Sequence, residues 1–294
     1  MKPAPFDYHA PRSLDEATGL LANLENAKVL AGGQSLVAMM NFRYVIVDHL
    51  VDLAGITALS GIETGDGVLR IGAMTRQRDL EFSPDIKRHC PILQAALLHV
   101  GHRQTRNRGT IGGSLAHADP AAELPALCLL HDAQIEIASR RGTRRVPMRG
   151  FGLGFMTTAV EPDEIVTAVE LKLWPAGHGF GFQEFARRRG DFALAGSAAL
   201  LDVAPDQTIR GAAVALFGVG ASPVRLDAAE AGLAGKRLDL AAVVGAAAQA
   251  RSIEPLEDIH AGADYRRHLA EVLTRRALLD AARRSGVMIE AKHA

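Results

Sequence analysis

The chain has 294 residues, enough for one large domain or two ordinary ones, of which 48% are hydrophobic and 22% charged. Its 33 lysines and arginines balance its 33 aspartates and glutamates, so no net charge draws it to nucleic acid or to anionic lipid. Only 5% of the residues are aromatic, which argues against a surface that binds single strands by stacking.

The first half of the chain alternates helical and extended segments. Residues 13–27 predict an amphipathic helix with a capping box, because Glu16 follows Ser13 at a spacing of three. Another helix is expected over 91–102, and one more ahead of residue 134. Strands are expected at 28–31, 44–53, 67–75, 134–138 and 164–174.

Residues 140–148 predict a hairpin with an arginine-rich tip. A nucleic-acid contact is one interpretation of this charge, but the balanced total charge favours a solvated hairpin.

The segment "PAGHG" (175–179) is the clearest linker. Beyond it come two strand- or helix-like pieces around Gly190, an extended segment with a turn, and an alanine-rich helical region to about Ser285. We therefore predict an α+β protein with domains over 1–176 and 177–286 and a tail over 287–294.

Both cysteines, Cys90 and Cys128, lie in apolar segments, so buried thiols are expected rather than a disulfide or a metal pair. An Fe–S cluster takes about four cysteines. Redox chemistry would therefore need an organic cofactor or the metals of a partner. The first residues lack the apolar core of a signal peptide, which predicts a cytoplasmic protein.

In "VLAGGQSLVAMM" (29–40) an apolar strand runs into Gly32 and Gly33, which expose backbone N–H groups, while Ser35 adds a hydroxyl. Such a nest suits phosphate oxygens, although a plain glycine turn is the alternative. The dinucleotide fingerprint G-x-G-x-x-G is absent.

The segment "TIGGS" (110–114) repeats this pattern of a β-branched residue, paired glycines and a hydroxyl, ahead of a helix start. Chance alone explains two such segments in one domain poorly. A diphosphate bridging two facing loops would explain both, and it implies a dinucleotide with an adenosine and a second ring.

In "FARRRGDFALAG" (185–196) three arginines, Arg187 to Arg189, precede Asp191 and Phe192. They could place charge and a stacking ring near a cofactor, or they could form a strand edge with an Arg–Asp pair. The sequence shows no nucleophile–His–carboxylate arrangement, and the histidines at 102, 117 and 131 are too scattered for a metal site.

The motifs "AGGQSL", "RNRGTIGGSLAHADPAAELPA" and "RRRGDFALAG", in this order, make nearly the whole chain similar to one family. It resembles the FAD-binding medium subunit of the molybdenum hydroxylases, the carbon monoxide dehydrogenase and xanthine dehydrogenase family. The resemblance implies a two-lobed FAD-binding domain of the p-cresol methylhydroxylase/vanillyl-alcohol oxidase type. A smaller C-terminal domain with a three-stranded sheet and helices would follow it.

The resemblance also implies partners. A large subunit would carry molybdenum with molybdopterin cytosine dinucleotide, and a small subunit two [2Fe–2S] clusters, in a dimer of heterotrimers. Substrate would be hydroxylated at molybdenum, and electrons would pass through the clusters to FAD and on to an external acceptor. This chain would perform no bond-making on the substrate.

Residue by residue, the resemblance implies FAD contacts in both glycine segments. The diphosphate cradle would comprise Val29, Leu30, Ala31, Gly32, Gly33, Gln34, Ser35 and Leu36 together with Thr110, Ile111, Gly112, Gly113 and Ser114.

Further contacts are implied outside these segments. Val100 would lie on the adenine side, Glu123 would replace an aspartate that contacts the cofactor, and Val166 would offer its backbone beside the flavin. Asp191 and Phe192 would contact the isoalloxazine. Many relatives have lysine where this chain has Ala186, and Arg187 is the candidate substitute although its planar guanidinium differs from an ammonium.

Two other functions stay open. One is a stand-alone FAD-dependent oxidoreductase of the same fold, and the other a non-catalytic nucleotide-binding or assembly protein. The substrate of the holoenzyme and its electron acceptor are not encoded in the motifs of this chain.

Overall fold

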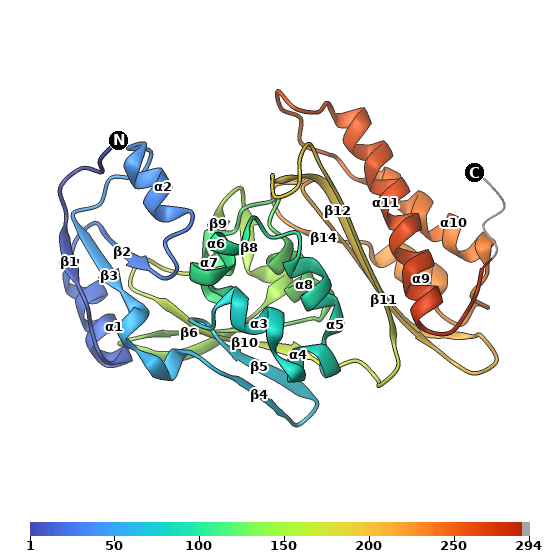
Figure 1. Cartoon of the computed structure of the whole chain (residues 1–294), viewed down its shortest axis with the longest axis horizontal. Helices are drawn as coiled ribbons and strands as arrows, with labels where there is room; N and C mark the ends of the chain where they lie inside the picture. The colour runs from blue at the N-terminus through green and yellow to red at the C-terminus, as the bar shows by residue number, and fades with distance from the viewer. Residues whose placement is uncertain (290–294) are drawn as a thin grey trace.

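The computed structural model describes residues 1–289 and begins with a small parallel sheet (Figure 1). Its strands β1 (Asp7–His9), β3 (His49–Asp52) and β2 (Ala27–Leu30) pair in the order β1-β3-β2, and α1 (Leu14–Asn23) connects β1 to β2. Ser13 caps α1 by accepting a hydrogen bond from the Glu16 N–H, as the capping box predicts.

The strand predicted over 44–53 is shorter than expected. The N–H groups of Tyr44 and Val45 both donate to the Met39 carbonyl, so this stretch folds back on α2 (Leu36–Asn41) instead of extending. The left-handed backbone of Arg43, at φ 60°, makes that turn.

A five-stranded antiparallel sheet forms the second lobe, in the order β4-β5-β10-β6-β7. Its strands are β4 (Ile62–Gly65), β5 (Val68–Gly72), β6 (Gln134–Ser139), β7 (Gly142–Pro147) and β10 (Ile165–Lys172). The short strands β8 (Gly152–Gly154) and β9 (Thr157–Thr158) pair separately. Two lobes match the expected FAD-binding domain.

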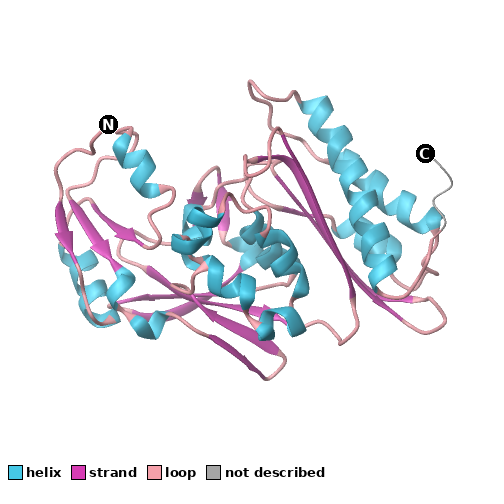
Figure 2. Cartoon of the chain, viewed as in Figure 1, coloured by secondary structure: helices cyan, strands magenta, loops and turns pink. Residues whose placement is uncertain are grey.

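Six short helices lie together beside this sheet (Figure 2). They are α3 (Gln77–Phe82), α4 (Pro84–His89), α5 (Pro91–Leu97), α6 (Arg103–Arg108), α7 (Ile111–His117) and α8 (Glu123–Leu130). Their buried side chains, with those of the sheet, form the largest apolar core of the molecule. Cys90 and Cys128 are buried free thiols in this core, as predicted.

The C-terminal part contains a sheet in the order β11-β12-β13-β14 with three helices on one face (Figure 1). The expected three strands are β11 (Gly179–Ala186), β12 (Ala193–Val203) and β13 (Ile209–Phe217). The expectation is wrong by one strand, because Val224–Arg225 pairs with β13 as the two-residue β14.

The helices of this part are α9 (Asp227–Leu233), α10 (Leu240–Ala248) and α11 (Ala263–Arg284). Helix α11 packs so closely on β11 that a Cβ at Gly181 would lie 1.9 Å from the Ala277 carbonyl oxygen. The predicted domain boundary falls between β10 and β11. Of the predicted tail, Val287 packs into the C-terminal core, and residues 290–294 lie outside the described residues.

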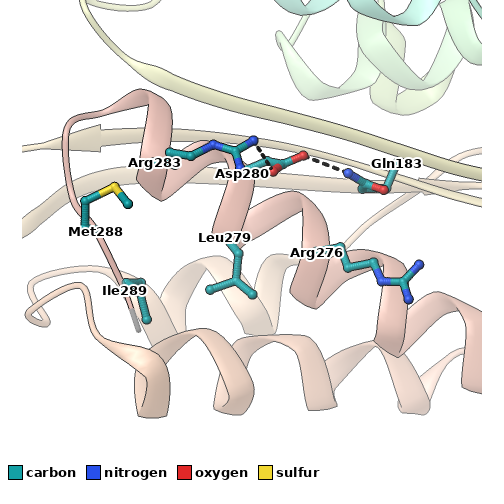
Figure 3. A pocket seen from close by; sticks show the side chains of 7 residues that line it. All are labelled: Gln183, Arg276, Leu279, Asp280, Arg283, Met288 and Ile289. Atoms are coloured by element: carbon teal, nitrogen blue, oxygen red, sulfur yellow. Dashed lines mark hydrogen bonds and ion pairs between the residues drawn. The ribbon is translucent and has the colours of Figure 1, made fainter. Parts of the chain in front are cut away.

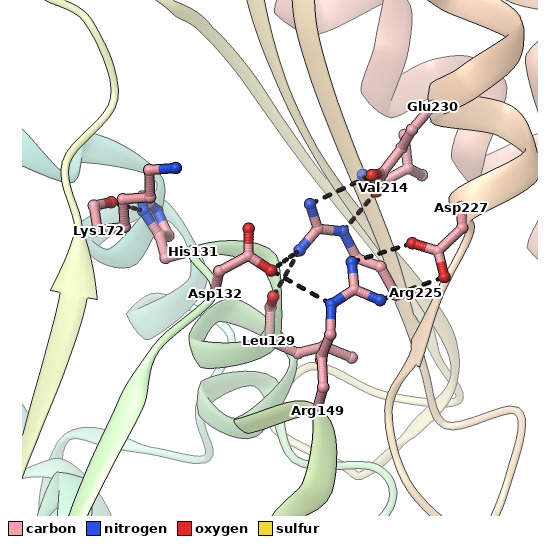
Figure 4. Close-up of polar contacts among 9 residues, drawn as sticks. All are labelled: Leu129, His131, Asp132, Arg149, Lys172, Val214, Arg225, Asp227 and Glu230. Carbon is pink, nitrogen blue, oxygen red and sulfur yellow. Dashed lines mark hydrogen bonds and ion pairs between the residues drawn. The ribbon is translucent and has the colours of Figure 1, made fainter. Parts of the chain in front are cut away.

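Charged side chains join the two parts of the chain (Figure 4). The nearly buried Arg225 guanidinium donates to the Leu129 carbonyl and to Asp132 on one side, and to Glu230 on the other. Arg149 bridges Asp132 and Asp227 in the same way. The seam between the parts is therefore fixed by ion pairs as well as by apolar contact.

The basic hairpin β6–β7 is ion-paired along its length. Arg141, Arg144 and Arg145 contact Asp163, Glu164 and Glu170, respectively. The predicted hairpin is therefore present, and carboxylates just before and on β10 pair with these three arginines. Within residues 1–289, no helix combines the length and the apolar character needed to cross a bilayer.

Candidate functional site

The two glycine segments lie directly against each other. A Cβ at Gly32 would fall 2.3 Å from the Arg108 carbonyl oxygen and 2.8 Å from the Gly109 Cα. A Cβ at Gly113 would fall 3.2 Å from the Ala31 Cβ. The two loops therefore face each other, although they are far apart in the sequence.

The first segment leaves its amides unused. It follows β2 at the carboxyl edge of the parallel sheet, where Leu30 lies opposite Asp52. Within residues 1–289, no protein acceptor binds the N–H groups of Gly32, Gly33, Gln34 and Ser35. Successive backbone N–H groups without acceptors at such an edge can donate hydrogen bonds to an anion.

The second segment differs from the first in its hydrogen bonding. Gly112 and Gly113 lie in the first turn of α7, where the Ile111 N–H donates to Thr75 and the Gly112 N–H to Ala73. The Gly113 N–H donates to the Thr110 hydroxyl at 3.0 Å. These amides have protein acceptors, and the predicted contact of Thr110–Ser114 with the diphosphate stays a prediction.

Gly112 is required for packing. A Cβ there would lie 2.4 Å from the Ala73 Cβ and 2.9 Å from the Ala73 Cα, closer than atoms approach in proteins. The glycine lets α7 pack onto the end of β5. The start of α7, with Thr110 and Gly113, thus lies beside Ala31 of the first segment.

Two carboxylic acids meet where α8 approaches β11. Burial, and next the charge of Glu184, raises the pKa of Glu123 to about 8. Burial raises the pKa of Glu184 to about 7. Glu184 has a side chain only 4% exposed, and among residues 1–289 its Oε2 atom has no hydrogen-bond partner. Burial thus shifts both acids toward the protonated form relative to an exposed carboxylate.

His99 faces this acid pair. Its Nδ1 atom lies 3.7 Å from the Glu184 Oε2, and burial together with the charge of Arg189 lowers its pKa. A neutral imidazole next to a protonated acid is the arrangement these shifts favour. The orphaned Glu184 oxygen can still accept a hydrogen bond from a ligand.

Sequence reasoning identified Glu123 but missed Glu184. The available signal was strand alternation, since Phe180, Phe182 and Glu184 share the face of β11 that packs on the FAD-binding part. A carboxylate that continues an apolar stripe marks a buried acid.

The β11–β12 loop carries the arginine-rich motif. Arg187 contacts His260 at 3.1 Å and Asp191 at 3.6 Å, so the Arg–Asp pair is present. Phe192 is 71% exposed. Gly190 packs on His102, which caps α6, and the loop therefore reaches the helix that precedes the second glycine segment.

The side chains of Val100 and Val166 point into the apolar core, so only their backbones could contact a ligand. The Val100 carbonyl accepts a hydrogen bond from Arg106, and Val166 lies opposite Ile137 in the sheet. Their predicted cofactor contacts stay predictions.

The buried pair of Cys90 and His131 does not form an activated thiolate nucleophile. The Cys90 Sγ lies 3.2 Å from the His131 Nε2, but burial raises the pKa of the thiol to about 12 and lowers that of the imidazole to about 4. Both groups are therefore neutral. No cluster of three metal-ligating side chains occurs in the described part of the chain.

A hollow of about 340 Å³ lies under α11 on the opposite face of β11 (Figure 3). Gln183 and Arg283 both hold Asp280 there, at 2.7 and 2.8 Å. Because Gln183 and Glu184 are consecutive strand residues, they face opposite sides of the sheet. This hollow therefore lies on the other side of β11 from Glu184, and no residue of the glycine segments lines it.

Two family models together match most of the chain. The model for the FAD binding domain in molybdopterin dehydrogenase matches residues 4–174, and that for the CO dehydrogenase flavoprotein C-terminal domain matches residues 180–281.

Two curated relatives are similar along the full chain. The 6-hydroxypseudooxynicotine dehydrogenase complex subunit alpha of Paenarthrobacter nicotinovorans is 37% identical, covering 97% of both chains. The carbon monoxide dehydrogenase medium chain of Hydrogenophaga pseudoflava is also 37% identical, over 95% of this chain and 97% of its own.

A solved structure shares the fold. The carbon monoxide dehydrogenase from Hydrogenophaga pseudoflava that lacks the Mo-pyranopterin moiety of its cofactor superposes with a TM-score of 0.94 at 39% identity, covering 97% of this chain and 99% of that one.

Proposed function

Because the chain belongs to the family of FAD-binding subunits of molybdopterin dehydrogenases, we propose that it binds FAD as an electron-transfer subunit. In this proposal FAD takes electrons from the [2Fe–2S] clusters of a partner and passes them to an external acceptor. The reaction on the organic substrate takes place on another subunit.

The observation that carries this proposal is the row of undonated amides from Gly32 to Ser35, held against the second glycine segment. These donors fit a diphosphate, because several N–H groups on adjacent residues can bind its oxygens together. The orphaned Glu184 oxygen is a second unmet hydrogen-bonding group in the molecule.

Different residues would contact different parts of FAD. The amides of 32–35 and the hydroxyls of Thr110 and Ser114 would hold the diphosphate, and the backbones of Val100 and Val166 would line the site. Arg187, Asp191 and Phe192 would border the flavin ring. Bound FAD supplies a two-electron carrier, and the protein sets its position and surroundings.

The glycine segments fall in the FAD-binding domain that we place at 1–176, and the loop 187–192 in the second domain at 177–286. The site would then lie between domains, whose seam is fixed by Arg225 and Arg149.

The proposed partners are a large molybdopterin-binding subunit and a small [2Fe–2S] subunit, assembled as a dimer of heterotrimers. Relatives that are medium chains of larger enzymes support this. A cytoplasmic location is part of the proposal, consistent with two buried free thiols.

Co-expression with a large molybdopterin-binding subunit and a small [2Fe–2S] subunit tests the proposal. We expect a complex containing FAD, iron and molybdenum, whose flavin is reduced after its substrate is added. Turnover of an organic donor by the isolated chain would support a stand-alone oxidoreductase instead. A full chain that binds no flavin at all would contradict the proposed function.

A further inference from the structure

Arg76 lies beside the second glycine segment. It caps α3, and it forms an isolated antiparallel bridge with Thr110, supported by the Gln77 N–H donating to the Gly109 carbonyl at 2.8 Å. Opposite residues of an antiparallel bridge project to the same side. The Arg76 side chain therefore extends on the side of Thr110.

The Arg76 guanidinium reaches the point where the two segments touch. Its Nη1 donates to the Arg108 carbonyl. That same carbonyl oxygen is the atom that a Cβ at Gly32 would strike. The hydrogen bond from Arg76 to the Arg108 carbonyl therefore holds a positive charge close to Gly32, where the backbone N–H groups without acceptors begin.

No carboxylate neutralises this charge. Within residues 1–289, neither Arg76 nor Arg108 forms an ion pair, and the pKa of Arg76 is lowered, first by burial and then by the charge of Arg108. Asp52 and Asp79 act in the opposite direction without offsetting the lowering. Arg108 is exposed, and its charge lies close enough to act on Arg76, so both guanidinium groups can serve one anion.

The neighbouring arginines behave differently. Arg78 lies 4.0 Å from Glu81 and over the ring of Phe82, and Arg106 donates to Glu81 at 2.8 Å. Unlike these two arginines, Arg76 has no carboxylate partner among residues 1–289, and it lies at the contact between the two glycine segments.

We infer that Arg76, with Arg108 next to it, binds the diphosphate of the dinucleotide cofactor. The inference rests on the proposed function and adds charged donors to the neutral amides of residues 32–35. The planar guanidinium can use one donor on the Arg108 carbonyl and keep others for phosphate oxygens.

Titration of the flavin-free full chain with FAD, followed by flavin fluorescence, tests this. We expect Arg76→Gln to weaken FAD binding by ~10-fold to ~100-fold, the effect of losing a charge-assisted hydrogen bond. Riboflavin has no phosphate, so it lacks the oxygens that the Arg76 guanidinium would bind. Its affinity should therefore change less than ~2-fold. The control Arg78→Gln should leave both affinities unchanged.

Equal FAD affinity in the native chain and Arg76→Gln would overturn the inference, and so would an equal loss for FAD and riboflavin, which indicates a structural role. A native chain that binds no FAD would instead refute the proposed function.

A second measurement needs no variant. The native chain is treated with phenylglyoxal, and the modified arginines are mapped with and without FAD. Protection of Arg76 but not of Arg78 is expected. Modification of Arg76 at the same rate with and without FAD would overturn the inference even if Arg76→Gln failed to fold.

Discussion

Gly32–Gly33 and Gly112–Gly113 are two glycine pairs in contact, yet their backbones have different partners. The first pair follows a parallel strand, and among residues 1–289 no protein acceptor binds its four successive amides, 32–35. The second pair begins a helix, and its amides are bound to Ala73 and Thr110. One segment offers donors, whereas the other supplies the surface against which those donors are held.

This difference teaches that a glycine pair has two distinct uses. Glycine opens the backbone to a ligand in the first segment, and it permits close contact between two backbones in the second. The following predictions test this division, from the largest expected effect to the smallest.

Gly112→Ala should lower the free energy of unfolding by about 3 kcal/mol, because the added Cβ overlaps the backbone of Ala73 and overpacked cores seldom relax fully. Urea denaturation of the flavin-free chain measures this. The control is Gly19→Ala in α1, where a Cβ meets no atom within 4 Å, and stability should rise by about 0.5–1 kcal/mol. A Gly112→Ala chain as stable as the native one would remove the packing role.

Gly32→Ala should act on binding more than on folding. Its Cβ would push the Arg108 carbonyl away and separate the two segments, so FAD affinity should fall by roughly 10-fold or more, about 1.4 kcal/mol. Fluorescence titration measures the affinity, and denaturation should show a smaller stability loss than in Gly112→Ala. Unchanged FAD affinity would contradict a cofactor role for the first segment.

The acid pair Glu123 and Glu184 should make stability depend on pH. Glu123 and Glu184 have pKa values raised to about 8 and about 7, so the folded state holds protons that the unfolded state releases near pH 4.5. Their contribution is complete below pH 4.5 and is lost as pH rises to about 8. Between pH 5 and 8, unfolding free energy should fall by at least ~1.4 kcal/mol, the equivalent of one pKa unit.

Glu184→Gln should reduce this slope, because an amide replaces the titrating acid without changing its size. Denaturation at pH 5, 6, 7 and 8 measures the difference between the two chains. Identical slopes would show that Glu184 does not hold the proton.

Gly113→Ala should have the smallest effect. The new Cβ would lie 2.8 Å from the Thr110 hydroxyl, a side-chain atom that can rotate away, and alanine favours the helix. We expect stability within ~1 kcal/mol of the native chain and FAD affinity within ~5-fold. A loss as large as that of Gly112→Ala would show that the two glycines share one packing role.

Much of the fold follows from local signals. Ser13 and Glu16 determine the start of α1, strand alternation identifies β5, β6 and β10, and the linker at 175–179 precedes β11. The misjudged stretch, 44–48, is as β-branched as a strand, but hydrogen bonds to Met39 in α2 turn it back. Such a bond depends on the position of another element, so propensity alone could not reveal it.

The candidate site was predicted in part. The motifs singled out both glycine segments because they appear as patterns in the chain, whereas Glu123 was singled out by the family resemblance. Glu184 and Arg76 were missed, because each acquires its role only from its neighbours: burial beside Glu123 and His99 for one, and proximity to Arg108 and Gly32 for the other.

The sequence by itself determined the two glycine pairs, the helix and strand types and the family to which they belong, because these depend on residue identity and short spacing. Only the tertiary structure decided that the amides of residues 32–35 have no acceptor among residues 1–289, that burial raises the pKa of Glu123 and Glu184, and that Arg76 has no carboxylate partner there. Hydrogen-bond satisfaction, burial and charge neutralisation are set by groups distant in the chain, and these become neighbours only when it folds.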